Sequence, residues 1–166
     1  MLIHLVKLTL LFILATIGHW AFSSLFALSG FNINILLVSV IALCTCCKMQ
    51  TGYTMAFLCG LFLDFFSTKL FGYNAFSFTL VALIIYGVSE RLDFESVFPQ
   101  MFTTFVLTIF VSVVNNALVL FFTASTMWAG WWSVLSGALL TTLIAPVVFA
   151  FIRWLVGQKD LGADRY

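Results

Sequence analysis

The sequence predicts an all-α integral membrane protein, folded as a bundle of six transmembrane helices. Of the 166 residues, 63% are hydrophobic and only 8% are charged, whereas soluble domains carry roughly 25% charged residues. The apolar residues form long runs with short polar breaks between them. Because each helical crossing needs about 20 residues, a chain of this length holds at most about six spans and no separate soluble domain. We therefore expect a single transmembrane domain over residues 1–166.

The polar breaks set the limits of the expected helices. Ser29-Gly30 and Gly72 are turn signals, and residues 48–51 form a short polar stretch. Residues 90–95 are too charged for hydrocarbon and are interpreted as a solvated connector, with partner docking as the alternative. An uncharged loop covers residues 123–130. The expected spans are residues 5–28, 31–47, 52–67, 71–88, 97–122 and 131–156.

The first two spans offer few groups with distinctive chemistry. The apolar run of residues 5–28 is longer than the core of a signal peptide, about 7–15 residues, so we interpret it as a retained span. His19 has no second ligand at helical spacing, which favours a hydrogen-bonded packing role over a metal or proton site. Asn32 or Asn34 is expected to cap the start of the second span. The cysteines are interpreted as small apolar membrane residues rather than as a metal site, a lipidation site or a disulfide framework. They are Cys44, Cys46, Cys47 and Cys59.

The third span combines small residues with one carboxylate. Gly52, Ala56, Gly60 and Asp64 recur every four residues, so they share one face of a helix. Small residues allow a second helix to approach closely within lipid. A carboxylate at bilayer depth costs at least a few kcal/mol and needs a partner. We expect Asp64 to be either neutral or hydrogen-bonded by a neighbour.

The fifth span carries a polar stripe. Thr104, Thr108, Ser112 and Asn116 also repeat every four residues, and Asn115 is adjacent. This spacing predicts a line of hydrogen-bonding groups along one helix face.

Counting the helix rise from each end brings the acid of the third span and the amides of the fifth to a similar depth. If Asp64 is hydrogen-bonded, its expected partners are Asn115, Asn116 or a hydroxyl near Ser67. The sequence therefore allows a polar cluster of Asp64, Asn115 and Asn116, with Lys69 as a further member. It has two interpretations, which are structural attachment between the third and fifth spans or a site for a ligand or partner.

The sixth span begins at Trp131-Trp132, a pair typical of the aromatic belt at the membrane surface. Gly137, Thr141 and Ala145 repeat the four-residue spacing of small residues. Pro146 should kink the helix, because it removes one backbone hydrogen bond.

The distribution of Lys and Arg predicts the orientation. With a cytoplasmic N-terminus, six spans place six basic residues inside and only Lys69 outside, a strong bias by the positive-inside rule. Both termini are then cytoplasmic. The six are Lys7, Lys48, Arg91, Arg153, Lys159 and Arg165.

No pattern in the chain predicts an enzyme. We find no Ser, His and Asp set in a recognisable context, no paired intramembrane carboxylates, no phosphate-binding glycine loop and no HExxH motif. We therefore expect no catalytic residue, no metal site, no bound cofactor and no nucleic-acid partner.

The third and fourth spans carry a family resemblance. Residues 60–67 read Gly-Leu-Phe-Leu-Asp-Phe-Phe-Ser, and residues 71–75 read Phe-Gly-Tyr-Asn-Ala. With six short spans, this pattern resembles the rod shape-determining protein MreD family. The segment 31–34 departs from it, because the family often has Pro-Asn or Pro-Asp there. The residues that carry the resemblance are Gly52, Gly60, Leu63, Asp64, Ser67, Gly72 and Ala75.

The resemblance implies a non-enzymatic scaffold in the bacterial inner membrane. It would work in the elongation machinery with a single-span MreC-like protein, and with MreB, RodZ, RodA and penicillin-binding protein 2. The MreD fold is similar to that of the vitamin-binding S-components of energy-coupling-factor transporters, so a vitamin-binding subunit is the alternative. The outer loops are too short and plain to form a substrate lid, which favours the scaffold. Our candidates for helix packing or partner contact are Gly52, Ala56, Gly60, Asp64, Ser67, Gly72, Ala75, Asn115 and Asn116.

Overall fold

The computed structural model describes residues 12–13, 15–20, 33–67, 70–88, 94, 96–123 and 130–156, and every regular element in these ranges is a helix. The expected all-α class is confirmed. Residues 12–13 and 15–20, within the expected first span, are helical, and the rest of that span lies outside the described residues. The other helices are α2 (Ile35–Cys46), α3 (Met49–Phe66), α4 (Tyr73–Val88), α5 (Val97–Thr123) and α6 (Trp131–Val156).

The helices differ in length. In the described part of the chain, α5 and α6 are long and apolar enough to cross a membrane, with 27 and 26 residues. Helices α2 and α4 are apolar but shorter, with 12 and 16 residues. At about 1.5 Å per residue, α2 is about 18 Å long and does not match a hydrocarbon core about 30 Å thick.

The second helix starts later than the expected residue 31. It begins at Ile35 because Asn34 caps it, and the Asn34 side chain accepts a hydrogen bond from the Leu37 amide at 3.1 Å. One of the two expected caps is thus correct, and Asn32 lies outside the described residues.

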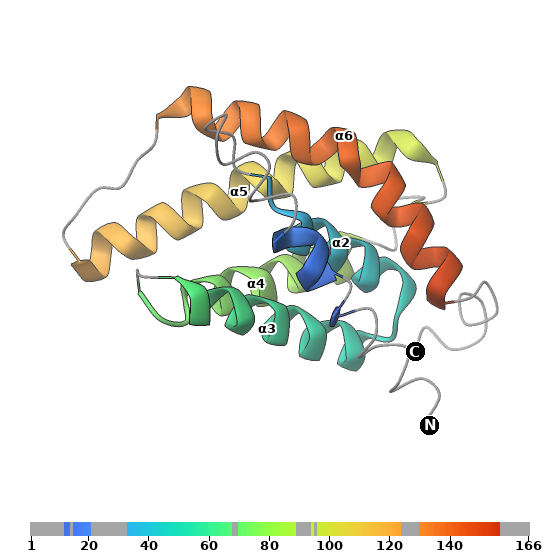
Figure 1. The fold of residues 1–166 in the computed structure, drawn as a ribbon, viewed down its shortest axis with the longest axis horizontal. Coiled ribbons are helices and arrows are strands. Elements are labelled where there is room, and N and C mark those ends of the chain that lie inside the picture. The colour runs from blue at the N-terminus through green and yellow to red at the C-terminus, as the bar shows by residue number, and fades with distance from the viewer. Residues whose placement is uncertain are drawn as a thin grey trace.

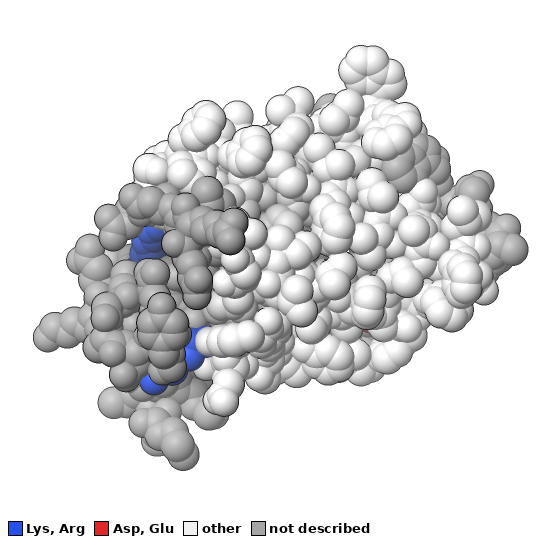
Figure 2. Space-filling view, turned by 180° about the vertical axis from the view of Figure 1, so that it is seen from behind, with Lys and Arg blue, Asp and Glu red and all other residues white. Residues whose placement is uncertain are grey.

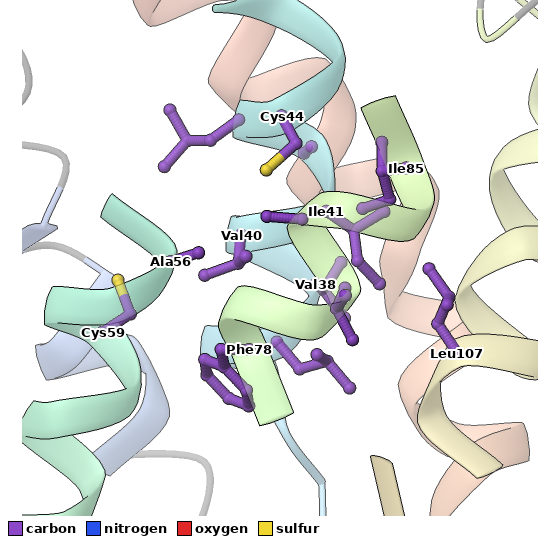
Figure 3. Packing of buried hydrophobic residues seen from close by; sticks show 14 of the residues in the cluster. Val38, Val40, Ile41, Cys44, Ala56, Cys59, Phe78, Ile85 and Leu107 are labelled. Carbon is purple, nitrogen blue, oxygen red and sulfur yellow. The ribbon is translucent and has the colours of Figure 1, made fainter. Parts of the chain in front are cut away.

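Helix α2 forms the centre of the core. Eleven of its twelve residues are buried, as expected for a helix that is apolar on every side. It lies between the α3–α4 pair and α6 (Figure 1). Its side chains belong to a buried cluster with residues of α3, α4, α5 and α6, part of which is shown in Figure 3. The labelled members of this cluster are Val38, Val40, Ile41 and Cys44 of α2, Ala56 and Cys59 of α3, Phe78 and Ile85 of α4, and Leu107 of α5.

Helix α6 bends near its middle, where it passes over the bundle (Figure 1). Pro146 lies inside this helix, as the sequence predicts. A proline in a helix interior lacks the amide that would bond to the preceding turn, which accounts for the bend.

Charge is confined to one end of the described surface. Lys48 immediately precedes α3, and Arg153 lies in the last turn of α6. Both helix ends lie on the same side of the molecule (Figure 1). Figure 2 shows Lys and Arg only at this end, while most of the remaining visible surface carries neither sign of charge. We call it the basic end. The opposite end, which holds the α3–α4 turn and the start of α6, we call the turn end.

Candidate functional site

The small residues of α3 lie on one buried face. Gly52, Ala56, Gly60 and Asp64 are all buried, together with Cys59. Their four-residue spacing places them along the same side of the helix, as the sequence predicts. The helix packed most extensively against α3 is α4.

Gly60 is the point of closest approach between these two helices. A Cβ atom at Gly60 would lie 2.5 Å from the Ala75 Cα and 2.6 Å from the Ala75 amide nitrogen. Both are backbone atoms of α4 and cannot move aside as a flexible side chain would. At Gly52, an added Cβ would meet the Tyr86 hydroxyl. Only a residue without a side chain fits either place in the present packing.

Asp64 joins the end of α3 to the start of α4. Its Oδ1 accepts a hydrogen bond from the Asn74 amide at 3.1 Å, and its Oδ2 accepts one from the Ala75 amide at 3.0 Å. The first amides of a helix have no hydrogen-bond partner within that helix. They also form the positive end of the helix dipole, which attracts an anion. Since Asp64 is only 2% exposed, its carboxyl group depends on these two donors.

The expected partners of Asp64 were wrong. The sequence indicated Asn115, Asn116 or a hydroxyl near Ser67, whereas the donors are backbone amides of α4. The reason is that the turn after α3 returns the chain directly, so the unused amides of the next helix reach the carboxylate first. The available signal was an acid about ten residues before a helix start marked by Gly72. Lys69 lies outside the described residues.

Asn115 of α5 is connected to Asp64 indirectly, through hydrogen bonds to α4. Its Nδ2 donates to the Asn74 Oδ1 at 3.1 Å, and the Ser77 hydroxyl donates to the Asn115 Oδ1. Asn116 is half-buried and takes no part in these bonds. The polar cluster therefore attaches α5 to α4, not the third span to the fifth as expected. No pattern in the sequence indicated Asn74 or Ser77 for this role.

The turn between α3 and α4 holds three more candidates. The Ser67 and Tyr73 hydroxyls lie 3.2 Å apart and form a hydrogen bond across it. Gly72 has a φ of +96°, a left-handed conformation that glycine adopts without strain. Ala75 is buried, and its backbone meets both Gly60 and Asp64.

The polar stripe of α5 makes different hydrogen bonds from those expected. The Thr108 hydroxyl donates to the Thr104 carbonyl, and the Ser112 hydroxyl donates to the Thr108 carbonyl. These bonds satisfy the Thr108 and Ser112 hydroxyl groups within α5 itself, whereas the buried Thr104 hydroxyl has no hydrogen-bond partner among the described residues. They do not connect α5 to another helix, so Asn115 provides the cross-helix contact of this stripe.

Two contacts at the basic end were not anticipated. The Tyr86 hydroxyl donates to the carbonyls of Cys47 and Lys48, each at 3.2 Å, and so ties α4 to the α2–α3 turn. The Phe94 carbonyl accepts hydrogen bonds from the Gln100 side chain, at 2.7 Å, and from the Arg153 guanidinium. The second contact connects the segment before α5 with the end of α6.

The remaining candidates show no further arrangement. The cysteines are free thiols, of which Cys47 is half-buried and the others are buried. In the described residues, no group of three or more His, Cys, Asp or Glu side chains could hold a metal ion. His19 is half-buried, and its Nδ1 has no hydrogen-bond partner among the described residues.

The hydrogen bonds of Asp64 and Asn115 attach neighbouring helices to one another. Both carboxylate oxygens bind backbone amides, and the Asn115 amide is bonded through both its nitrogen and its oxygen. One carboxylate and one amide thus join three helices at the turn end. Comparisons with protein-family models, curated proteins and solved structures found no match for the chain.

Proposed function

We propose that the protein is a multi-pass membrane protein with six spans and both termini in the cytoplasm of a bacterial cell. The length and apolar composition of α5 and α6 support this placement. So does the location of Lys48 and Arg153 at one end of a largely uncharged surface (Figure 2). A cytoplasmic basic end agrees with the positive-inside rule.

Short helices are compatible with this placement. Helix α2 is enclosed by other helices, so its ends need not reach both membrane surfaces. Large apolar side chains are exposed on the outer helices, where lipid tails would cover them. Examples along α6 are Leu139, Leu143 and Val147.

We further propose that the protein is a non-enzymatic scaffold of the rod-shape machinery. One observation carries this proposal, which is that Gly60, Asp64, Gly72 and Ala75 of the MreD-like pattern meet at or beside the α3–α4 turn, whereas Gly52 lies at the basic end. Gly60 meets Ala75, Asp64 binds the start of α4, and Gly72 forms the turn. These residues pack and join the two helices of one hairpin, which fits a protein that its partners recognise by shape rather than through a reactive group.

The partner follows from the resemblance. A single-span MreC-like protein is the first expected partner, with MreB, RodZ, RodA and penicillin-binding protein 2 in the same assembly. The bacterial inner membrane is the expected location.

The test is purification of the tagged protein in mild detergent, followed by identification of bound proteins and small molecules by mass spectrometry. The proposal predicts an MreC-like single-span protein and no vitamin. Depletion of the protein should also make rod-shaped cells round. A tightly bound vitamin, together with a transporter subunit, would instead establish the S-component alternative.

A further inference from the structure

Arg153 is a half-buried cation that is fixed in position at the basic end. Its guanidinium donates a hydrogen bond to the Phe94 carbonyl. The same carbonyl accepts a bond from Gln100, a buried residue near the start of α5. A carbonyl oxygen has two lone pairs, and both are used here. The guanidinium is therefore held between α5 and α6 rather than extended into solvent.

This position leaves the charge of Arg153 without a described counter-ion. Asp64 is the only acidic residue in the described ranges, and its carboxylate is bound to the start of α4 at the turn end. The Phe94 carbonyl is a neutral acceptor. A guanidinium has five N–H donors in a planar fork, so one bond to a carbonyl leaves most of them available.

The neighbouring aromatic residues indicate the depth of Arg153 in the membrane. Trp154 is 78% exposed, and its ring lies 6.2 Å from that of Phe151, which is also exposed. Tryptophan favours the headgroup level of a bilayer. The preceding turns of α6 expose only apolar side chains such as Leu143 and Val147. On the membrane placement proposed above, Arg153 therefore lies at the level of the lipid phosphates.

We propose that Arg153 binds the phosphate of an anionic phospholipid, with Trp154 and Phe151 in contact with its glycerol and upper acyl region. Guanidinium and phosphate form paired, charge-assisted hydrogen bonds. An anionic lipid is preferred because the headgroup of a zwitterionic lipid carries its own cation beside the phosphate. This inference rests on the membrane placement proposed above but not on the scaffold role.

The experiment is native mass spectrometry of protein released from nanodiscs with equal amounts of phosphatidylglycerol and phosphatidylcholine. The wild type should retain phosphatidylglycerol preferentially, and Arg153→Gln should lose about tenfold or more of that preference, because the charge-assisted hydrogen bonds to the phosphate are lost with the charge. Lys48→Gln, which removes a cation at the same end, is the matched control and should lose less, at most the roughly fivefold that any basic residue near a membrane surface contributes. Arg153→Lys, which keeps the charge but loses the fork, should be intermediate.

Each other outcome overturns the assignment. An unchanged preference in Arg153→Gln, or an equal loss in Lys48→Gln, would show that no specific site exists at Arg153. If Arg153→Gln does not fold, full retention by Arg153→Lys would exclude recognition by the guanidinium fork. Displacement of the lipid by excess inorganic phosphate would assign the site to a free anion. Failure of the wild type to enter nanodiscs would contradict the membrane placement itself, a separate result.

Discussion

Asp64 binds two amides with two oxygens, and this one-to-one match predicts the effect of changing it. Asp64→Asn replaces one acceptor by an NH₂ group, which would face an amide donor. Each buried amide left unsatisfied costs about 1–3 kcal/mol. We expect Asp64→Asn to lower the free energy of unfolding by about this amount, and Asp64→Leu, which removes both acceptors, by more. Denaturant unfolding in micelles would measure both, and equal stability of Asp64→Leu and the wild type would refute the role of the carboxylate.

Asn115 and Asn116 form a natural pair for comparison, because they are adjacent but only Asn115 bonds to α4. Measured hydrogen bonds between membrane helices average about 0.6 kcal/mol, with a maximum near 1.7 kcal/mol. Asn115→Leu should therefore destabilise the protein by about 1–2 kcal/mol, as two such bonds are lost. Asn116→Leu is expected to change the stability by less than about 0.5 kcal/mol. The same unfolding assay applies, and a larger effect at Asn116 would show that the hydrogen bonds are assigned to the wrong residue.

For individual residues, the sequence predicted which of them lie together on α3 but not what they bind. The spacing from Gly52 to Asp64 determines a helix face by geometry alone. The partner of Asp64 depends on the path of the turn between α3 and α4, which brings backbone amides to the carboxylate. Backbone donors are the same at almost every position, so only the distance from Asp64 to the helix start near Gly72 indicated them, and the side chains of Asn115 and Asn116 were expected instead.

At the scale of the element, Gly60 and Gly87 give opposite predictions for the same substitution. A Cβ at Gly60 would lie 2.5 Å from the α4 backbone, while a Cβ at Gly87 would meet nothing within 4 Å. Gly60→Ala should destabilise the protein by about 1–3 kcal/mol through overpacking. Gly87→Ala should be neutral or stabilising by up to about 1 kcal/mol, because alanine favours the helix. Thermal unfolding of the two variants would compare them, and a stable Gly60→Ala protein would exclude close packing of α3 on α4.

The helix limits were predicted within a few residues for α3 to α6, because charged or turn-forming residues interrupt the apolar runs. Helix α2 was less predictable. An apolar run does not show whether lipid or protein surrounds it, so residues 31–47 were interpreted as a full span. In the structure α2 has 12 residues and is enclosed on all sides. Its short length follows from tertiary packing, which a single sequence does not show.

For the whole molecule, the proposed membrane placement requires that the basic end and the turn end lie on opposite sides of the membrane. Lys48 and Arg153 belong to the first, and the α3–α4 turn and Trp131 belong to the second. On the proposed placement, the six-to-one distribution of basic residues predicts that the basic end faces the cytoplasm.

Reporter fusions would show on which side of the membrane each end of the molecule lies. One fusion follows Tyr166, and the other is placed within residues 123–130, each with a reporter active only in the cytoplasm and one active only outside it. With the proposed orientation, the cytoplasmic reporter should be active after Tyr166, and the external reporter should be active within residues 123–130. A C-terminus outside the cytoplasm, or both positions on the same side, would contradict it.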